Sequence, residues 1–274
     1  MELDGKVRPI EIVDEILRQN PDIPCPVPLE ELATAVGIQQ ISELVTEGFE
    51  GMLMTNPEKS QGVIMVKANA NPQRRRFTIG HELGHYLLPW HRQTRFSCSS
   101  ESIKDSGTDS KAARGLEMEA EANAFASELL MPSAIFKKLQ RKAGEPDIEQ
   151  VVKFSAHFDA SVEATARRFM NLSDYPVAFV FSLNDTVRYW TKGPEFPYLL
   201  SIKNGQQLPK QSSARGSGQG IGKMEELDGY IWLSDARGPG LPDKILEQTL
   251  HQQDGYKVTM LYIEEMPDED EDDE

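Results

Sequence analysis

The sequence predicts an α+β protein: a mainly helical core with a small β-sheet, a helix-turn-helix-like segment, and then a small antiparallel β-rich domain. Two observations support this class. A His-Glu-x-x-His motif lies in an apolar, helix-forming stretch at residues 77–88. Beyond residue 175, the chain changes to short runs rich in β-branched and aromatic residues, separated by turn-forming residues. A chain of 274 residues can form one large domain or two modest ones.

The composition is that of a globular protein with a strongly acidic balance. Hydrophobic residues make up 39% of the chain and charged residues 27%, and the net charge is −15. Because nucleic-acid binding needs a basic face, this acidity argues against direct nucleic-acid binding. The two cysteines form no paired motif, and we find no signal peptide or membrane-spanning run. We therefore expect a cytoplasmic protein with no membrane partner.

The motif residues are His81, Glu82 and His85. Residues four apart on a helix lie on one face, so both imidazoles can reach a single metal ion. Glu82 can then take a proton from a water molecule bound to that ion. The apolar flanks indicate a buried helix, in which imidazoles need polar partners. The alternative is that the histidines only cap or pack and that Glu82 is solvated.

A third ligand is expected in a helix predicted over residues 116–131. This stretch is rich in Ala, Glu and Leu, and it ends at Pro132. Its apolar stripe consists of Ala122, Phe125, Ala126, Leu129 and Leu130. Glu119 lies one turn before this stripe, which favours it as the third ligand.

The neighbouring polar residues have different expected roles. Asn123 lies four residues after Glu119, so its amide oxygen can hold a ligand histidine by the second ring nitrogen. By the helical period, Glu117 and Glu121 point away from the apolar stripe. Both are expected to be exposed helix formers. Glu121 remains open as the alternative third ligand, and His91 is a weaker alternative.

Two long runs together suggest a family. Residues 75–88 read Arg-Arg-Phe-Thr-Ile-Gly-His-Glu-Leu-Gly-His-Tyr-Leu-Leu, and residues 119–132 read Glu-Ala-Glu-Ala-Asn-Ala-Phe-Ala-Ser-Glu-Leu-Leu-Met-Pro. Over about residues 5–175 the chain resembles the ImmA/IrrE family of zinc metallopeptidases. The resemblance implies that Zn²⁺ is bound by two histidines and one glutamate and that a second glutamate is the catalytic base. In this chain the matching residues are His81, His85, Glu119 and Glu82.

Four parts are expected along the chain. They are a zinc metallopeptidase domain at 1–145, a helix-turn-helix-like segment at 146–173 packed on the peptidase, a β-rich domain at 174–263, and a disordered acidic tail at 264–274.

The peptidase domain should begin with helices at residues 8–20 and 29–36, because both carry apolar residues at helical spacing. Strands are predicted at 49–54 and 62–67. An extended peptide substrate is expected to pair with one of these two strands, although both are equally well explained as core strands. Residues 91–115 are polar and predict a long loop that covers the cleft.

Helices at residues 147–158 and 161–170 form the helix-turn-helix-like segment. Ser161 caps the second helix. Because Arg167 and Arg168 come at the end of that helix rather than at its start, structural packing is favoured over DNA binding. His157, at the end of the first helix, could stabilise an oxyanion.

The C-terminal part should be an antiparallel sheet with one helix at residues 241–251. Strands are predicted at residues 177–181, 187–190, 230–233 and 256–263, the first two forming a hairpin.

The leading hypothesis is a zinc endopeptidase that uses a metal-activated water. The family resemblance implies a helix-turn-helix (XRE-like) repressor as the protein substrate and control of stress-response or mobile-element genes. The alternative is a non-proteolytic regulatory or partner-binding protein of a toxin–antitoxin-like or phage module that also has a zinc site. Glu82 argues against this alternative, since a structural zinc site needs no base.

Overall fold

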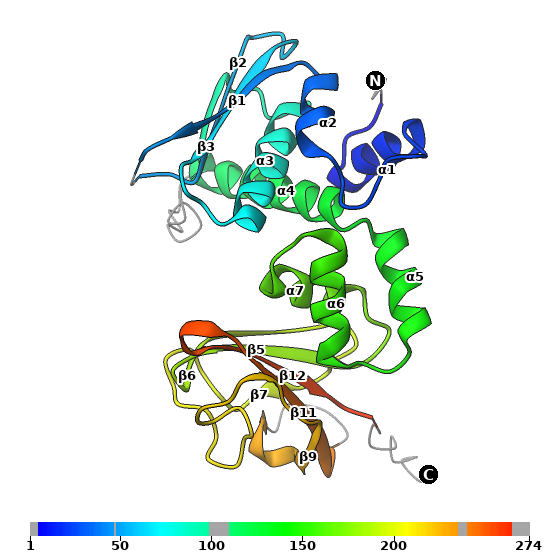
Figure 1. The fold of residues 1–274 in the computed structure, drawn as a ribbon, viewed down its shortest axis with the longest axis vertical. Coiled ribbons are helices and arrows are strands. Elements are labelled where there is room, and N and C mark those ends of the chain that lie inside the picture. The colour runs from blue at the N-terminus through cyan, green and yellow to red at the C-terminus, as the bar shows by residue number, and fades with distance from the viewer. Residues whose placement is uncertain (1–4, 47, 99–109, 235–239, 265–274) are drawn as a thin grey trace. The chain divides into compact units, whose positions relative to one another are not determined.

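The fold consists of two compact units. The computed structural model describes residues 5–46, 48–98, 110–234 and 240–264. The N-terminal unit comprises residues 1–132 and 156–161, and the C-terminal unit comprises residues 133–155 and 162–274. The predicted α+β class is confirmed, with helices beside a small sheet in one unit and an antiparallel sheet in the other (Figure 1). The four-part organisation stays a prediction, and its acidic tail lies almost wholly outside the described residues.

The N-terminal unit combines helices with a four-stranded sheet. Its elements in chain order are α1 (Pro9–Gln19), α2 (Leu29–Ala35), β1 (Ile38–Leu44), β2 (Gly51–Thr55), β3 (Gly62–Lys67), α3 (Pro72–Leu87), β4 (Arg95–Cys98) and α4 (Ser110–Leu130). The strand order is β1-β3-β2-β4, with β1 parallel to β3 and the other pairs antiparallel. In the described part of the chain, no helix is long and apolar enough to span a membrane.

The sheet topology corrects one expectation about peptide binding. The predicted strands correspond to β2 and β3, but each is flanked on both sides by another strand. Neither therefore offers an edge to a peptide, because its backbone groups are already paired. The edge strands are β1 and β4, which the sequence analysis did not predict. β4 also interrupts the loop predicted at residues 91–115; residues 99–109 of that loop lie outside the described part.

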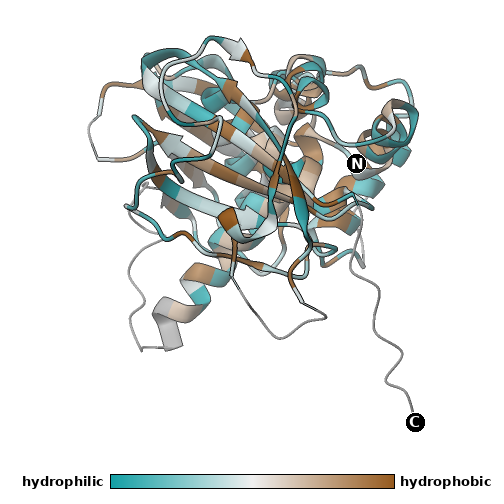
Figure 2. Cartoon of the chain, turned by 90° about the horizontal axis from the view of Figure 1, so that it is seen from below, coloured by the Kyte–Doolittle hydropathy of each residue, from teal (hydrophilic) through white to brown (hydrophobic). Residues whose placement is uncertain are grey.

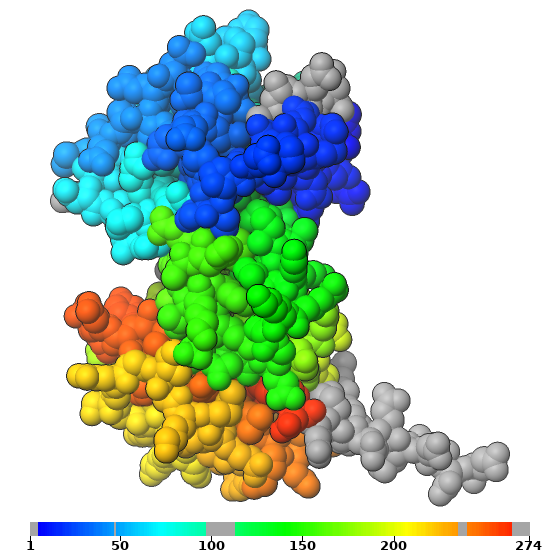
Figure 3. All heavy atoms as spheres, turned by 45° about the vertical axis from the view of Figure 1, so that its right-hand side comes forward, coloured from blue at the N-terminus to red at the C-terminus, as the bar shows by residue number. Residues whose placement is uncertain are grey.

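Helix α1 covers the outer side of α4. Its buried residues, Ile12, Val13 and Ile16, recur at helical spacing and form one apolar face. This face packs against α4, and α1 lies at the surface of its unit (Figure 3, dark blue).

Local sequence fixes both ends of α3. The Asn71 side chain accepts a hydrogen bond from the Gln73 backbone N–H at 2.9 Å, and Pro72 begins the helix. The helix ends at Leu87, because the proline that follows Leu88 disfavours helical backbone there. Lys59, in the β2–β3 turn, donates from Nζ to the His85 carbonyl oxygen at 2.5 Å and so caps the helix.

The C-terminal unit is built from three helices and an antiparallel sheet. Its longer elements are α5 (Ser133–Ala143), α6 (Ile148–Phe158, whose last residues belong to the N-terminal unit), α7 (Val162–Leu172), β5 (Val177–Leu183), β6 (Thr186–Lys192), β9 (Glu225–Asp228), β11 (Lys244–His251) and β12 (Tyr256–Tyr262). The shorter elements are β7 (Leu199–Leu200), β8 (Gly220–Ile221), β10 (Leu233–Ser234) and the 3₁₀ turns η1 (Gly229–Ile231) and η2 (Gln253–Gly255). The main sheet has the order β6-β5-β12-β11-β8, with β9 also paired to β11.

Strand β5 separates two apolar layers because successive side chains point to opposite faces. Phe179 meets Phe169 of α7 edge-on, with ring centroids 6.4 Å apart. Ala178 and Val180 instead join the core around Trp232 on the other face. The apolar residues of the strands are visible as brown segments in Figure 2. The helices thus cover one face of the sheet, while irregular chain covers the other.

Two predictions for this unit were wrong. The helix predicted at residues 241–251 is strand β11, which pairs with β12 and β9. Its Leu, Glu and Gln residues suit a helix locally, but pairing and burial in the sheet outweigh this preference. Of the strand predicted at residues 230–233, Tyr230 and Ile231 lie in the 3₁₀ turn η1 and only Leu233 lies in strand β10.

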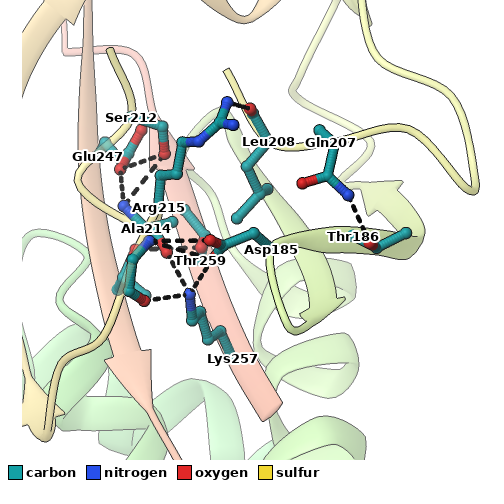
Figure 4. A network of polar contacts seen from close by, with 12 residues as sticks. Asp185, Thr186, Gln207, Leu208, Ser212, Ala214, Arg215, Glu247, Lys257 and Thr259 are labelled. Carbon is teal, nitrogen blue, oxygen red and sulfur yellow. Dashed lines mark hydrogen bonds and ion pairs between the residues drawn. The ribbon is translucent and has the colours of Figure 1, made fainter. Parts of the chain in front are cut away.

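A buried carboxylate organises the irregular layer of this unit. Glu247 of β11 is fully buried, and its Oε2 accepts a hydrogen bond from Trp232 Nε1 at 2.6 Å. Its Oε1 accepts hydrogen bonds from the hydroxyls of Ser212 and Ser213 at 2.9 and 2.7 Å (Figure 4 shows Ser212). Several donors thus offset the cost of burying the charge and tie three chain segments together.

We expect Glu247→Ala to destabilise the C-terminal unit by about 3 kcal/mol, because it leaves the buried indole and hydroxyl donors without their acceptor. Urea unfolding followed by tryptophan fluorescence measures the change. The exposed Glu225 of β9 supplies the control, since Glu225→Ala should leave the midpoint unchanged. Equal midpoints for the two variants would contradict this account of Glu247.

Candidate metal centre

The candidate site forms where α3 and α4 cross at close range. Gly84 faces α4 so closely that an added methyl group would lie 3.1 Å from the Ala122 Cα and 3.1 Å from the Phe125 Cβ. One turn earlier, a methyl group on Gly80 would lie 3.4 Å from the Ala126 Cβ. Small residues on both helices therefore let the two backbones approach. The polar residues beside this seam are brought within contact distance of one another.

Three predicted residues converge at this crossing. His81 Nε2 and His85 Nε2 lie 3.1 Å apart. His81 Nε2 is 3.3 Å from Glu119 Oε2, and His85 Nε2 is 3.3 Å from Glu119 Oε1. One ligand atom from each residue lies within 4.8 Å of the other two. Two imidazole nitrogens and a carboxylate form a donor set that fits a divalent transition-metal ion.

Asn123 holds the first imidazole from behind. Its Oδ1 lies 2.9 Å from His81 Nδ1, which can donate to the amide oxygen. A proton on Nδ1 leaves the Nε2 lone pair of His81 directed toward Glu119 and His85. Asn123 therefore lies against the ring nitrogen of His81 that faces away from Glu119 and His85.

The site combines an ionised carboxylate with a neutral ring. Burial lowers the pKa of His85 to about 4, despite the opposing hydrogen bond with Glu119. Burial also acts to lower the pKa of His81, but the hydrogen bond with Glu119 and the charge of Glu82 outweigh it, so that pKa is raised. Burial acts to raise the pKa of Glu119, yet its polar contacts with His81 and His85 hold it well below its usual value. The carboxylate is therefore negatively charged and suited to a cation.

Glu82 lies on the same helix and is fully buried against β2. A methyl group added to Gly51, the first residue of β2, would lie 2.6 Å from Glu82 Oε1 and 2.4 Å from the Thr78 methyl carbon. The absence of a side chain at Gly51 therefore makes room for the Glu82 carboxylate. This role of Gly51 leaves no local pattern in the chain, because the contact joins residues 31 positions apart.

Two residues differ from their sequence-based interpretation. Glu121 is not a solvated helix former, because its Oε2 accepts hydrogen bonds from Trp90 Nε1 at 2.5 Å and from His91 Nε2 at 3.0 Å. His91 is fully buried, and its Nδ1 lies 2.9 Å from His85 Nδ1. Both therefore lie behind a candidate ligand, outside the group formed by His81, His85 and Glu119. The signal that the sequence offered for this role was the presence of a further histidine, His91, and a further glutamate, Glu121, close to the two motifs.

His157 has a different position from these residues. Its side chain is exposed, and its ring meets Phe158 edge-on with centroids 4.8 Å apart. In the described part of the chain, no polar contact joins its ring to the candidate ligands.

Helices α3 and α4 present two imidazoles and a carboxylate to one point, and a glutamate follows the first histidine. This is the arrangement of His-Glu-x-x-His metalloproteases. Residues 46–170 match the sequence model of the Peptidase_M78 family, described as the IrrE N-terminal-like domain. Over these residues the resemblance to the ImmA/IrrE family of metal-dependent peptidases is confirmed.

The fold is also similar to that of a Mycobacterium tuberculosis transcriptional regulator, with a TM-score of 0.56 and 13% sequence identity. The match covers 93% of this chain and 76% of the regulator. At this identity the likeness concerns the fold alone. No curated protein has a sequence that matches the chain.

The geometry predicts which glutamate of α4 contributes to metal binding. We expect Glu119→Gln to weaken the binding of Zn²⁺ by more than about 100-fold, because loss of a ligand should exceed the 10–100-fold cost typical of an outer partner. Glu117→Gln on the same helix is the matched control, since Glu117 is exposed. Competition with a chromophoric chelator measures both affinities. Equal affinities would exclude Glu119 as a ligand.

Proposed function

We propose that this protein is a cytoplasmic zinc-dependent endopeptidase in which His81, His85 and Glu119 bind Zn²⁺ and Glu82 is the catalytic base. The observation that carries the proposal is the convergence of two imidazoles and one carboxylate. In a tetrahedral site with bonds of about 2.0–2.1 Å, neighbouring ligand atoms lie about 3.3–3.4 Å apart. The two Nε2 atoms lie 3.1 Å apart, and each is 3.3 Å from one of the two Glu119 carboxylate oxygens, so this spacing suits a zinc ion.

Three protein ligands also favour catalysis over a purely structural role. Structural zinc sites use four protein ligands, whereas catalytic sites leave one position for water or substrate. The described residues supply one group of three such ligands at this site. The cation, when bound, supplies a Lewis acid that polarises the scissile carbonyl and makes a water molecule more acidic.

Glu82 supplies the proton transfers of the proposed reaction. Its carboxylate is buried next to His81, whose pKa it helps to raise, so it lies close enough to act electrostatically on the site. It accepts the proton of the attacking water and then delivers that proton to the leaving amine. Gly51 and Thr78 bound the space in which this carboxylate lies.

The substrate proposed here is a helix-turn-helix (XRE-like) repressor, whose cleavage would switch on stress-response or mobile-element genes. The support is the membership of residues 46–170 in the IrrE-like family, together with the resemblance of both motifs to ImmA/IrrE proteins. A natural candidate is a small repressor encoded beside this protein. One cut in that repressor, dependent on Zn²⁺, is the expected activity.

We expect Glu82→Gln to keep the fold and Zn²⁺ but to reduce cleavage by about 10²–10⁴-fold, because the amide cannot accept the proton. Purified wild type and variant, each checked for bound zinc, are incubated with the neighbouring repressor, and products are followed by mass spectrometry. Binding without cleavage by the zinc-loaded wild type would instead favour the non-proteolytic regulator.

A second variant tests the space around the base. Gly51→Ala should push the Glu82 carboxylate from its position and lower kcat by about tenfold or more, because small misplacements of catalytic groups are costly. Zinc affinity should stay within about threefold of wild type, since no ligand is touched. The matched control is Gly115→Ala, where an added methyl group meets no atom within 4 Å. Unchanged kcat in Gly51→Ala would show that the carboxylate adjusts freely.

A further inference from the structure

His91 is held firmly beneath the end of α3. It follows the turn after that helix, and its backbone N–H donates to the Leu88 carbonyl oxygen at 3.3 Å. The side chain is fully buried, and its ring lies 4.9 Å from that of His85 and 6.1 Å from that of Phe96, measured between centroids. A buried imidazole needs partners for both ring nitrogens. These partners are His85 on one side and Glu121 on the other.

The hydrogen bonds allow one consistent assignment of protons when His85 is a metal ligand. Its Nε2 must then offer a lone pair, so its proton lies on Nδ1. That proton points to His91 Nδ1 at 2.9 Å, which must be the acceptor. The proton of His91 therefore lies on Nε2, from which it is donated to Glu121 Oε2 at 3.0 Å. The Glu121 carboxylate accepts this hydrogen bond as well as the one from Trp90.

We propose that His91 and Glu121 form an outer pair that fixes the tautomer and orientation of His85 as a zinc ligand. They are positioning residues, and the inference rests on the proposed function. Glu121 directs the proton of His91 to Nε2, and His91 thereby presents a lone pair to His85. His85 is then held in the form that leaves its own Nε2 available. Asn123 alone fixes the tautomer and orientation of His81 in the same way, whereas His85 depends on two residues, His91 and Glu121.

Variants can distinguish the positioning role of His91 and Glu121 from simple packing. His91→Phe keeps a ring of similar volume but removes the acceptor for His85 Nδ1. His91→Gln restores an oxygen acceptor. On α4, Glu121→Ala removes the acceptor for His91, whereas Glu121→Gln keeps an amide oxygen that can accept the same proton. Glu121 is one-third exposed, so its replacement should not disturb folding.

The experiment measures the Kd for Zn²⁺ by chelator competition and the Nδ1–H signal of His85 by ¹⁵N imidazole NMR of each protein saturated with Zn²⁺. His91→Phe and Glu121→Ala should each weaken binding by about 10–100-fold and shift the His85 Nδ1–H signal, because its acceptor at 2.9 Å is removed or no longer oriented. Both glutamine variants should stay closer to wild type than these two. The exposed histidine and glutamate variants His157→Phe and Glu117→Ala are the matched controls and should bind as wild type does.

Three outcomes lead to different conclusions. If wild type binds Zn²⁺ tightly and both His91→Phe and Glu121→Ala keep its affinity and its His85 Nδ1–H signal, the positioning role is wrong while the zinc site stands. If wild type binds no Zn²⁺, the proposed function itself fails. If His91→Phe does not fold, as judged by circular dichroism, the comparison of Glu121→Ala with Glu121→Gln decides the question.

Discussion

The close crossing of α3 and α4 is the constraint on which the candidate centre depends. Gly80 and Gly84 on one helix meet Ala122 and Ala126 on the other, so the two backbones approach without intervening side chains. Only at such a distance can a carboxylate one turn away reach two imidazoles on the facing helix. The glycines weaken α3 as an isolated helix. Burial of nearly the whole of its second half, including Ile79 and Leu83, offsets that cost.

Around this crossing, each imidazole is held at the nitrogen that faces away from the centre. His81 is held by an amide and His85 by a second imidazole. Phe96 of β4 stacks on His85 with ring centroids 4.3 Å apart, and this restricts the tilt of the ring. The sheet therefore contributes to the site twice, through Phe96 on one strand and through the bare backbone of Gly51 on the next. Pre-organised groups of this kind lower the reorganisation needed when a cation binds.

Local patterns were enough to predict much of the N-terminal unit. The helical period placed Glu119 and Asn123 on the side of α4 that faces the motif histidines, since these positions depend only on spacing within one helix. The period alone did not explain Glu121, because its partners come from a turn that follows another helix. Strand β1 was missed because it is an edge strand whose buried and exposed residues do not alternate. Strand β4 was missed because its four residues lie within a stretch that is otherwise polar.

The C-terminal unit was harder to predict for a related reason. Its layer opposite the helices is mainly irregular chain, and Glu247 anchors that chain through side-chain hydrogen bonds rather than through a repeating pattern. Strand β11 has the residue types of a helix and becomes a strand through its neighbours. Buried polar anchors and non-local pairing leave little trace in a single sequence.

The division of the chain into two units has a consequence for how such a protein can diversify. Among the described residues, every group assigned to the candidate centre, from Gly51 to Asn123, belongs to the N-terminal unit. Substitutions on the surface of the other unit can therefore accumulate without altering the geometry of the ligands. The C-terminal unit can therefore vary in sequence while the N-terminal unit retains the residues of the candidate centre.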